Sequence, residues 1–412
     1  MRLLPAFLLA MTTAATAQGF RSADLLEKTI RTEMNDWGIG GVAVALVADG
    51  QIIHRAGFGE AQADSIFRAG SISKLFNAIA VMQLVEAGDL DLDAPLAADL
   101  LPLNPFPGSP SVTLRQLLCH RSGLQREAAV GSYFDDSGPS LAATIASLRD
   151  SVLVTVPGEK TRYSNVGASL AGHLVAQASG RSFADYQQKH LLGPLGMEDS
   201  AWTLARAKRE RIVVSHMRVA DGAGGWTRRE APLFDLGTIP AGNLFATAED
   251  LARFALALLA DDVGGLVKPA TLREMWTPQL TDDQTGFGIG FAVGRFREHR
   301  SIGHNGAVYG HSCAFSLLPD EDLGVIVLGN EDIANGRIAA ITREALSLLL
   351  AEKRDEAPPV VPAPVRAASL EDFAGHYESP SYWAHLTVRG GRLTGALSGQ
   401  PLTLTPTGTL SF

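Results

Sequence analysis

Cysteine is almost absent from this chain of 412 residues, which contains only Cys119 and Cys313. Two cysteines cannot build a disulfide scaffold, although they could form a single bridge in an exported protein. The sequence does not say whether the two lie close together. We expect both to act as small, buried, apolar residues.

An excess of positive charge is also lacking. The chain has 35 lysines and arginines against 44 aspartates and glutamates, and its formal net charge is −9. This balance argues against a general nucleic-acid binder, which usually carries a basic face, and gives no polybasic patch for a membrane. With 412 residues, 46% of them hydrophobic, the chain can bury the core of one large domain plus a smaller one, or of two domains.

Several familiar functional motifs are missing. The chain has no H-E-x-x-H zinc motif, no G-x-x-x-x-G-K-[ST] phosphate loop and no G-x-S-x-G elbow. The pair Gly38-x-Gly40 precedes an expected strand, whereas a dinucleotide fingerprint follows a strand and opens a helix. We therefore expect neither a metal ion nor a cofactor.

The N-terminus has the features of a signal peptide in their usual order. Arg2 precedes an apolar run over residues 3–11, and residues 15–17 give a small-x-small cleavage site before Gln18. The run is too short for a stable membrane anchor, and no later stretch reaches the length of a transmembrane helix. We expect an exported protein, periplasmic or secreted, rather than a buried N-terminal helix.

The rest of the chain alternates between strand-like and helix-like blocks. Two strands at 42–48 and 51–58 are joined by the hairpin signal Asp49-Gly50. A mostly helical block over residues 75–207 follows. The remaining expectations are helices at 23–37, 248–259 and 334–350 and strands at 301–309, 312–318 and 324–328. This order predicts an α/β unit plus an all-α insert, with one antiparallel sheet flanked by helices.

The C-terminal part is separated by a stretch rich in proline. The expected division is a signal peptide at 1–17, a main domain at 18–353, a linker at 354–369 and a β-rich module at 370–412. Three or four short strands make a poor independent core. The module therefore either leans on the main domain or is the beginning of a larger barrel, and we favour the partial barrel.

Lysine is scarce, and only one of the seven lysines has a serine three residues before it, in Ser71-Ile72-Ser73-Lys74. Residues three apart share a helix face, so the Ser71 and Lys74 side chains can meet. Free N–H groups at the helix N-terminus favour a developing anion. The alternative is an N-cap serine beside a solvated lysine.

Two further motifs complete a possible site for nucleophilic catalysis. Tyr163-Ser164-Asn165 lies before an expected helix, and His304-Asn305-Gly306 lies on an expected strand. Either Tyr163 or Lys74 could take the serine proton, because nearby cations lower a tyrosine pKa and burial lowers a lysine pKa. Asn165 can orient Lys74 and the substrate.

An oxyanion hole is expected from two backbone N–H groups, those of Ser71 and Ala307. Gly306 is needed beside them, because a side chain there would obstruct a substrate lying along the strand. His304 is expected to line the site, whereas His120 and His311 are expected to be structural. Four aromatic residues could wall an acyl pocket, although such residues usually belong to the core: Trp226, Phe234, Phe287 and Tyr309.

With these motifs the chain resembles the serine β-lactamase and penicillin-binding-protein superfamily, in its branch of class C β-lactamases, D-aminopeptidases, D,D-peptidases and esterases. The resemblance covers about residues 24–350. It includes Phe67-Arg68-Ala69-Gly70-Ser71, Pro240-Ala241-Gly242-Asn243-Leu244, Gly303-His304-Asn305-Gly306 and the segment 114–124. It implies a sheet domain plus a helical domain, a Ser71 acyl-enzyme, and Lys74 with Tyr163 as the acid–base pair. It also implies that the C-terminal module is similar to the beginning of a barrel carried by some members.

One departure from the family pattern concerns His304. The resemblance implies that β-lactamases and many D,D-peptidases carry a lysine at this place, where its charge holds a substrate carboxylate. Histidine is largely neutral at pH 7. We therefore expect an amide or ester hydrolase, D-aminopeptidase-like, D,D-peptidase-like or esterase-like, acting on a small molecule or a peptide that could derive from peptidoglycan. The alternatives are a β-lactamase proper and a penicillin- or cell-wall-peptide-binding protein without turnover.

Overall fold

The computed structural model describes residues 19–220, 226–281, 283–358, 369–378, 383–397 and 400–404. Its centre is one antiparallel sheet in the order β2-β1-β11-β10-β9-β8-β7. Both N-terminal strands and all three late strands lie in it, which confirms the predicted sheet. Its strands are β1 (Gly41–Ala48), β2 (Gln51–Gly59), β7 (Gly286–Phe287), β8 (Ala292–Phe296), β9 (His299–Val308), β10 (His311–Leu318) and β11 (Leu323–Gly329).

Short turns set the register of this sheet. Asp49 and Gly50 both have positive φ, at 49° and 71°, as a two-residue hairpin between β1 and β2 requires. β1 then pairs along its other edge with β11, from Val42 opposite Gly329 to Ala48 opposite Leu323. Segments nearly 300 residues apart in sequence thus form the middle of one sheet.

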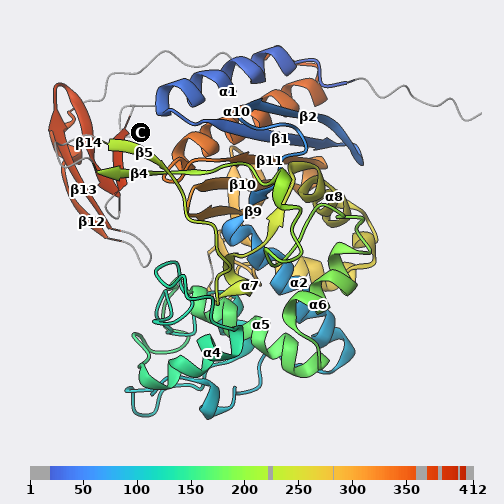
Figure 1. The fold of residues 1–412 in the computed structure, drawn as a ribbon, viewed down its shortest axis with the longest axis vertical. Coiled ribbons are helices and arrows are strands. Elements are labelled where there is room, and N and C mark those ends of the chain that lie inside the picture. Colours follow the sequence, from blue (N-terminus) through green and yellow to red (C-terminus); the bar gives the residue numbers. More distant parts are fainter. Residues whose placement is uncertain are drawn as a thin grey trace, which may run out of the picture.

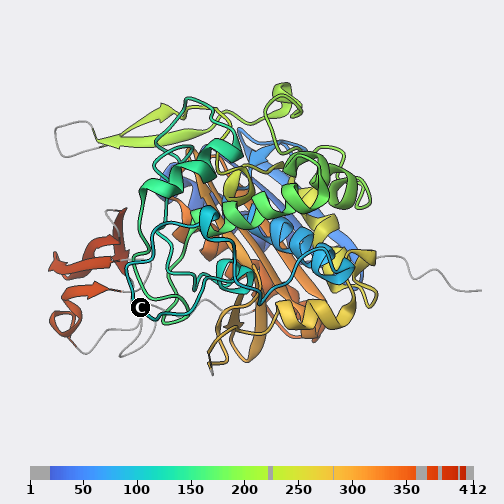
Figure 2. The same ribbon diagram turned by 90° about the horizontal axis from the view of Figure 1, so that it is seen from below.

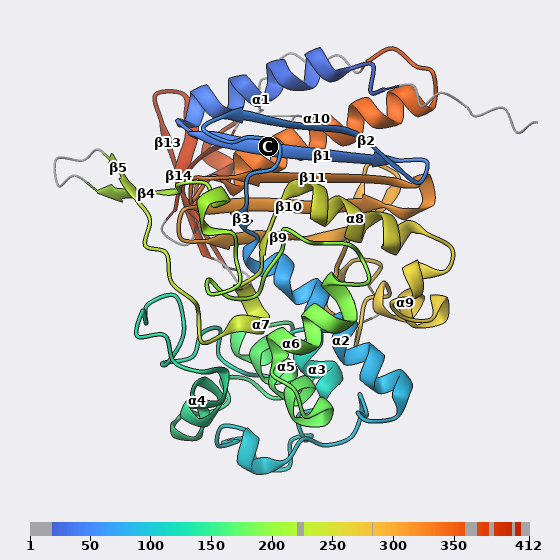
Figure 3. The same ribbon diagram turned by 45° about the vertical axis from the view of Figure 1, so that its right-hand side comes forward.

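Helices cover the sheet on both faces, as Figures 1 and 3 show. The first and last helices of the main domain, α1 (Ala23–Trp37) and α10 (Asn335–Lys353), pack on one face against alternating residues of β1 such as Val42 and Val44. The opposite face packs on α8 (Ala248–Leu259), which Thr247 caps by accepting a hydrogen bond from the Asp250 N–H. The flanking helices of the sequence-based prediction are therefore present.

The all-α insert lies on that second face, below α8 in Figure 3 and in front of the sheet in Figure 2, which is seen from below. Its elements are α2 (Ser73–Ala87), α3 (Leu114–Leu118), α4 (Leu141–Ala146), α5 (Asn165–Ser179) and α6 (Phe183–Gln187), with α7 (Ile239–Gly242) and α9 (Pro269–Met275) following later in the chain. Helix α3 is shorter than the predicted 114–120, because His120 takes a positive φ of 59°. The chain turns there toward α5.

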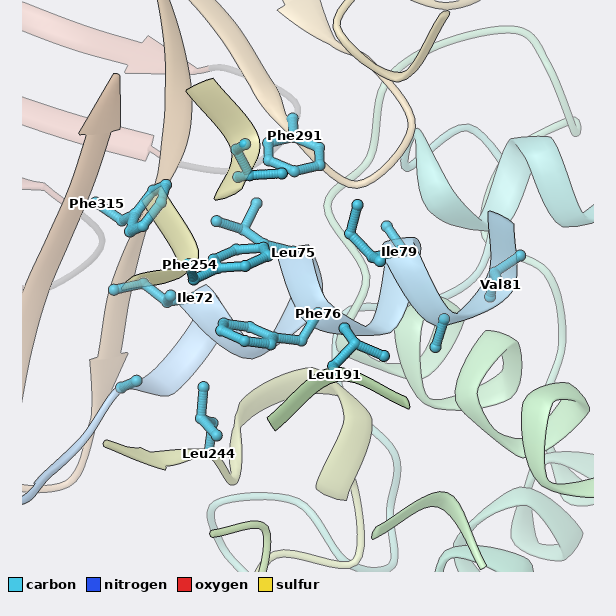
Figure 4. Packing of buried hydrophobic residues seen from close by; sticks show 14 of the residues in the cluster. Ile72, Leu75, Phe76, Ile79, Val81, Leu191, Leu244, Phe254, Phe291 and Phe315 are labelled. Carbon is cyan, nitrogen blue, oxygen red and sulfur yellow. The ribbon is translucent and has the colours of Figure 1, made fainter. Parts of the chain in front are cut away.

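Helix α2 joins the two halves of the molecule, and Figure 4 shows its surroundings. It is apolar on nearly all sides, as a helix through the core should be. Phe76 stacks on Phe254 of α8 with ring centroids 4.0 Å apart, and Phe254 in turn contacts Phe315 of β10 at 5.7 Å. Because this core is shared by sheet and insert, it fixes the N-terminus of α2 relative to β9.

Two small two-stranded sheets and a C-terminal sheet are separate from the central sheet. Strands β3 (Phe67–Arg68) and β6 (Phe245–Ala246) pair just before α2, and β4 (His216–Ala220) pairs with β5 (Trp226–Glu230). The C-terminal module forms a four-stranded antiparallel sheet from β12 (Gly375–Glu378), β13 (Trp383–Arg389), β14 (Arg392–Leu397) and β15 (Gln400–Leu404). The predicted signal peptide and most of the predicted linker lie outside the described residues.

Both cysteines are buried and free, as expected for small apolar residues. Burial raises the pKa of Cys119 to about 11 and that of Cys313 to about 12. In the part of the chain that the structure describes, no helix combines the length and apolar character needed to cross a membrane.

Candidate active site

Ser71 lies in a single turn of 3-10 helix, Gly70–Ile72, that leads directly into α2. Gly70 has a φ of 54°, and a Cβ atom there would lie 2.7 Å from the backbone nitrogen of Ala307. Only glycine fits such a conformation at such a close approach. The turn is therefore pressed against β9, and Ser71 is not the N-cap of α2, which is Ile72.

Lys74 is buried in the first turn of α2, with 3% of its surface exposed. Its Nζ atom is 3.0 Å from Ser71 Oγ, 2.6 Å from Asn165 Oδ1 and 2.7 Å from the carbonyl oxygen of Ala241. Burial holds the pKa of Lys74 well below its usual 10.5, while Glu127 opposes this shift. The alternative of a solvated lysine is wrong.

Tyr163 reaches the same serine from the segment before α5. Its hydroxyl donates to Ser71 Oγ at 2.8 Å. The Lys74 Nζ lies 4.9 Å from the centre of the Tyr163 ring, and the Arg126 guanidinium carbon lies 5.0 Å from it. The structure thus brings Tyr163 to Ser71 and Lys74, which the sequence placed in a different motif.

His120 supports the tyrosine ring. Its imidazole lies against Tyr163 with ring centroids 4.3 Å apart, and its Nδ1 accepts a hydrogen bond from the Ser164 N–H at 3.2 Å. Burial lowers the pKa of His120 well below 6.5, and the neighbouring Lys74 lowers it further. His120 is therefore neutral, and its contacts match the structural role expected for it.

Asn165 is oriented by Glu127, a residue that the sequence reasoning missed. The Asn165 Nδ2 donates to Glu127 Oε1 at 2.5 Å, which turns its Oδ1 toward Lys74. Ser164 caps α5 by accepting from the Gly167 N–H, so the Asn165 side chain is not needed as a cap. Burial raises the pKa of Glu127. The only sequence signal for this residue was the adjacent charged pair Arg126-Glu127 in a largely uncharged loop.

Strand β9 presents an open backbone edge beside Ser71. It pairs with β10 over residues 302–308 but with β8 only over residues 299–303. The two-residue turn Tyr309-Gly310 makes Val308 and His311 a hydrogen-bonded pair, so alternation directs the N–H and C=O of Ala307 away from β10. Both groups of Ala307 therefore face the edge that no described strand covers.

Gly306 allows this edge to approach the nucleophile. A Cβ atom at Gly306 would lie 2.1 Å from the carbonyl oxygen of Ala69. Its lack of a side chain thus serves contact with the Ser71 turn itself, in addition to the expected clearance for a substrate. The backbone segments of Ser71 and Ala307 are neighbours, as an oxyanion hole requires.

His304 is buried next to Tyr163, with ring centroids 5.9 Å apart. Its Nδ1 is 2.6 Å from the carbonyl oxygen of Asn305, and because a carbonyl only accepts, Nδ1 carries the proton. Burial lowers the pKa of His304 to about 4, with a further contribution from Lys74. The ring is neutral at pH 7, with Nε2 as a hydrogen-bond acceptor.

Three of the four aromatic candidates make contacts in two places. Phe287 contacts His120, Tyr163 and His304, with ring centroids 4.7, 6.1 and 6.3 Å away. Phe234 and Tyr309 lie together with ring centroids 6.3 Å apart.

Two further residues named in the sequence analysis are Trp226 and His311. Trp226 opens strand β5. His311 is fully buried, and burial lowers its pKa to about 3. Among the described residues, no cluster of three or more His, Cys, Asp or Glu side chains could hold a metal ion.

Comparison with known proteins places this arrangement in a family. The family model described as Beta-lactamase matches residues 26–349. Penicillin-binding protein 4 of Amycolatopsis lactamdurans is 30% identical over 377 residues, covering 85% of this chain and 95% of the relative. Esterase EstB of Burkholderia gladioli is 30% identical over 345 residues, covering 69% and 84%.

A solved structure extends the similarity to the fold. The octameric penicillin-binding protein homologue from Pyrococcus abyssi has a TM-score of 0.70 at 26% identity, covering 93% of this chain and 89% of that one. The predicted superfamily, its fold and a hydrolase of this kind are confirmed. The chain belongs to the beta-lactamase family.

Proposed function

We propose that this protein hydrolyses amides or esters through an acyl-enzyme on Ser71. One observation carries the proposal: Ser71 Oγ lies within hydrogen-bond distance of both Lys74 Nζ, at 3.0 Å, and the Tyr163 hydroxyl, at 2.8 Å. A serine becomes a nucleophile when an adjacent base takes its proton, and these contacts make Lys74 and Tyr163 the candidates for the base and the acid.

The contacts of Lys74 favour it as the base. A neutral amine has two N–H groups and one lone pair, and the carbonyl oxygens of Asn165 and Ala241 use both N–H groups. The lone pair of Lys74 Nζ is then left to face Ser71 Oγ, from which it can accept the serine proton. Burial favours this neutral form, because it lowers the pKa of Lys74.

Tyr163 then serves as the acid. Its hydroxyl donates to Ser71 Oγ, so its proton lies beside the bond that breaks when the leaving group departs. The backbone N–H groups of Ser71 and Ala307 stabilise the oxyanion of the tetrahedral intermediate. In deacylation, a water takes the place of the leaving group and the same groups act in reverse.

The charges around the site bear on the substrate class. Neutral His304 offers no cation for a carboxylate, so a penicillin or a free C-terminal D-alanine is held weakly at this position. Glu127 instead places a carboxyl group beside Asn165. Its Oε1 lies 3.5 Å from Arg126 Nε, whereas its buried Oε2 accepts from none of the described groups and favours an amine over a carboxylate in the substrate. The best-supported substrates are D-aminoacyl amides or peptides with a free amine, and simple esters; the relative named Esterase EstB supports the second class.

Export is part of the proposal and rests on the pattern of residues 1–17 alone. It places the enzyme in the periplasm or outside the cell, where peptides derived from peptidoglycan are available. N-terminal sequencing of the protein recovered from the periplasm and the medium should find the mature end near Gln18; an intact Met1 in all fractions would contradict export.

The function is tested by labelling together with a substrate panel. A fluorophosphonate should label the wild type and the control variant Ser65→Ala, but not Ser71→Ala. The panel contains D-alanine p-nitroanilide, p-nitrophenyl acetate and a chromogenic cephalosporin, and turnover should be greatest for the first two. Labelling at Ser71 without turnover of any substrate would favour the binding-protein alternative, and turnover of the cephalosporin alone would favour a β-lactamase.

A further inference from the structure

Tyr133, which belongs to no catalytic motif, reaches the open edge of β9. Its hydroxyl donates to the carbonyl oxygen of Ala307 at 3.4 Å. Tyr133 lies in the loop between α3 and α4, the loop that also carries Glu127. A side chain of the helical insert therefore contacts the strand along which we expect the substrate to lie.

The position of Tyr133 is fixed from several sides. Its ring packs edge-on to Tyr309 with centroids 6.3 Å apart. Its hydroxyl oxygen lies 3.5 Å from the place of a Cβ atom on Gly242, in α7. Burial raises the pKa of Tyr133, and Glu127 raises it further, so the hydroxyl stays protonated and remains a donor at neutral pH.

The Ala307 carbonyl has a defined task in substrate binding. An extended substrate adds to an open edge as a further strand. In an antiparallel hydrogen-bonded pair, one residue exchanges both bonds with the residue opposite. Consider a substrate residue whose scissile carbonyl accepts from the Ala307 N–H. The α-nitrogen of that substrate residue then lies at the Ala307 C=O, where the Tyr133 hydroxyl also lies.

Because the substrate nitrogen and the Tyr133 hydroxyl meet at the same carbonyl, the site distinguishes acyl groups with a free α-amine from acyl groups with an acylated α-nitrogen. A free amine ends at that nitrogen, has several N–H groups and can share the Ala307 carbonyl with Tyr133. Its charge also suits Glu127, whose Oε2 is buried and accepts from none of the described groups. An acylated nitrogen has a single N–H, and its chain must continue into the space of Tyr133.

We propose that Tyr133 closes the acyl end of the site and selects acyl groups whose α-nitrogen is a free amine, excluding N-acylated residues. The inference rests on the proposed Ser71 acyl-enzyme. It implies an exo-acting enzyme that cleaves after the first residue at the amino end of its substrate. Tyr133 contacts the strand that binds substrate and is a specificity-determining residue, with no part in proton transfer.

The test compares kcat/KM for D-alanine p-nitroanilide and N-acetyl-D-alanine p-nitroanilide. The wild type should prefer the free amine. Tyr133→Phe, which keeps the ring but frees the carbonyl, should reduce this preference about fivefold or more, the worth of one neutral hydrogen bond. Tyr133→Ala should reduce it further, because it also removes the ring. Phe134→Ala, at the adjacent and 84% exposed position, should leave the preference unchanged.

Two results would overturn the inference while leaving the proposed function intact. One is a wild type that cleaves both anilides equally well. The other is an unchanged preference in both Tyr133 variants when their melting temperatures and fluorophosphonate labelling show folded, reactive protein. A third result would refute the proposed function and the inference with it. In that result the wild type cleaves neither the two anilides nor the matching pair of p-nitrophenyl esters, and Ser71 takes no label.

Discussion

Gly306→Ala should disable the oxyanion hole while leaving the nucleophile and its base in place. The added methyl carbon would lie 2.1 Å from the carbonyl oxygen of Ala69. Ordinary contacts of this kind begin near 3.4 Å, so the two backbone segments must separate by roughly 1 Å. Ser71 follows Ala69 by two residues, and Ala307 follows Gly306 directly, so the separation acts on both oxyanion donors.

The expected cost is large because the hole works by geometry. Loss of one such donor lowers kcat by about 10²–10³, or about 2.7–4 kcal/mol. We expect a loss in this range for kcat on p-nitrophenyl acetate, calculated per folded molecule, with the folded fraction taken from circular dichroism at the assay temperature. The contacts of Ser71 Oγ with Lys74 and Tyr163 do not involve Gly306 and should remain.

Gly303→Ala is the matched control on the same strand. Its Cβ atom would lie 2.0 Å from the carbonyl oxygen of Phe315, so β9 is pushed from β10 instead of from the Ser71 turn. Both variants should lose stability, but only Gly306→Ala should lose most of its kcat. Equal kcat values for the two variants, or a kcat for folded Gly306→Ala within threefold of the wild type, would show that the contact of Gly306 with Ala69 does not position the oxyanion donors.

Two further predictions concern charge in the site. Glu127→Gln removes a carboxylate that raises the pKa of Lys74, so the ascending limb of kcat/KM against pH should move to lower pH; a move to higher pH would contradict Lys74 as the base. His304→Lys supplies the missing cation and should speed acylation by a cephalosporin by about 10- to 100-fold, the worth of one charged hydrogen bond. Stopped-flow measurement with a chromogenic cephalosporin checks this, and an unchanged rate would count against our interpretation of His304.

The main sheet could be predicted because its strands carry local signals. The apolar run of β1, the Asp49-Gly50 turn and the three late strands all read clearly in the sequence. The hairpin of β4 and β5 could not be predicted in this way, because ion pairs attach it to the main domain. Arg228 lies 2.8 Å and Arg218 lies 3.6 Å from the buried carboxylate of Glu331. Such pairs have no periodicity that a sequence pattern can show. The short strands β7 and β8 were not among the predicted strands.

The site was predictable where a residue belongs to a motif. Ser71, Lys74 and Tyr163 stand at recognisable spacings, and the structure places Lys74 Nζ and the Tyr163 hydroxyl 3.0 Å and 2.8 Å from Ser71 Oγ. Glu127 and Tyr133 belong to a loop without regular structure, so only the tertiary fold shows that they meet Asn165 and Ala307. The same holds for the Ala241 carbonyl, which a sequence cannot distinguish from any other backbone group.

The proposed mechanism requires Ser71 to become acylated during turnover. Mass spectrometry of protein quenched within milliseconds of mixing with p-nitrophenyl acetate tests it most directly. We expect an added acetyl group on the peptide that contains Ser71, formed and lost at rates consistent with kcat, and absent from Ser71→Ala. Turnover that persists in Ser71→Ala, or an acetyl group that forms on another residue at the rate of turnover, would contradict it.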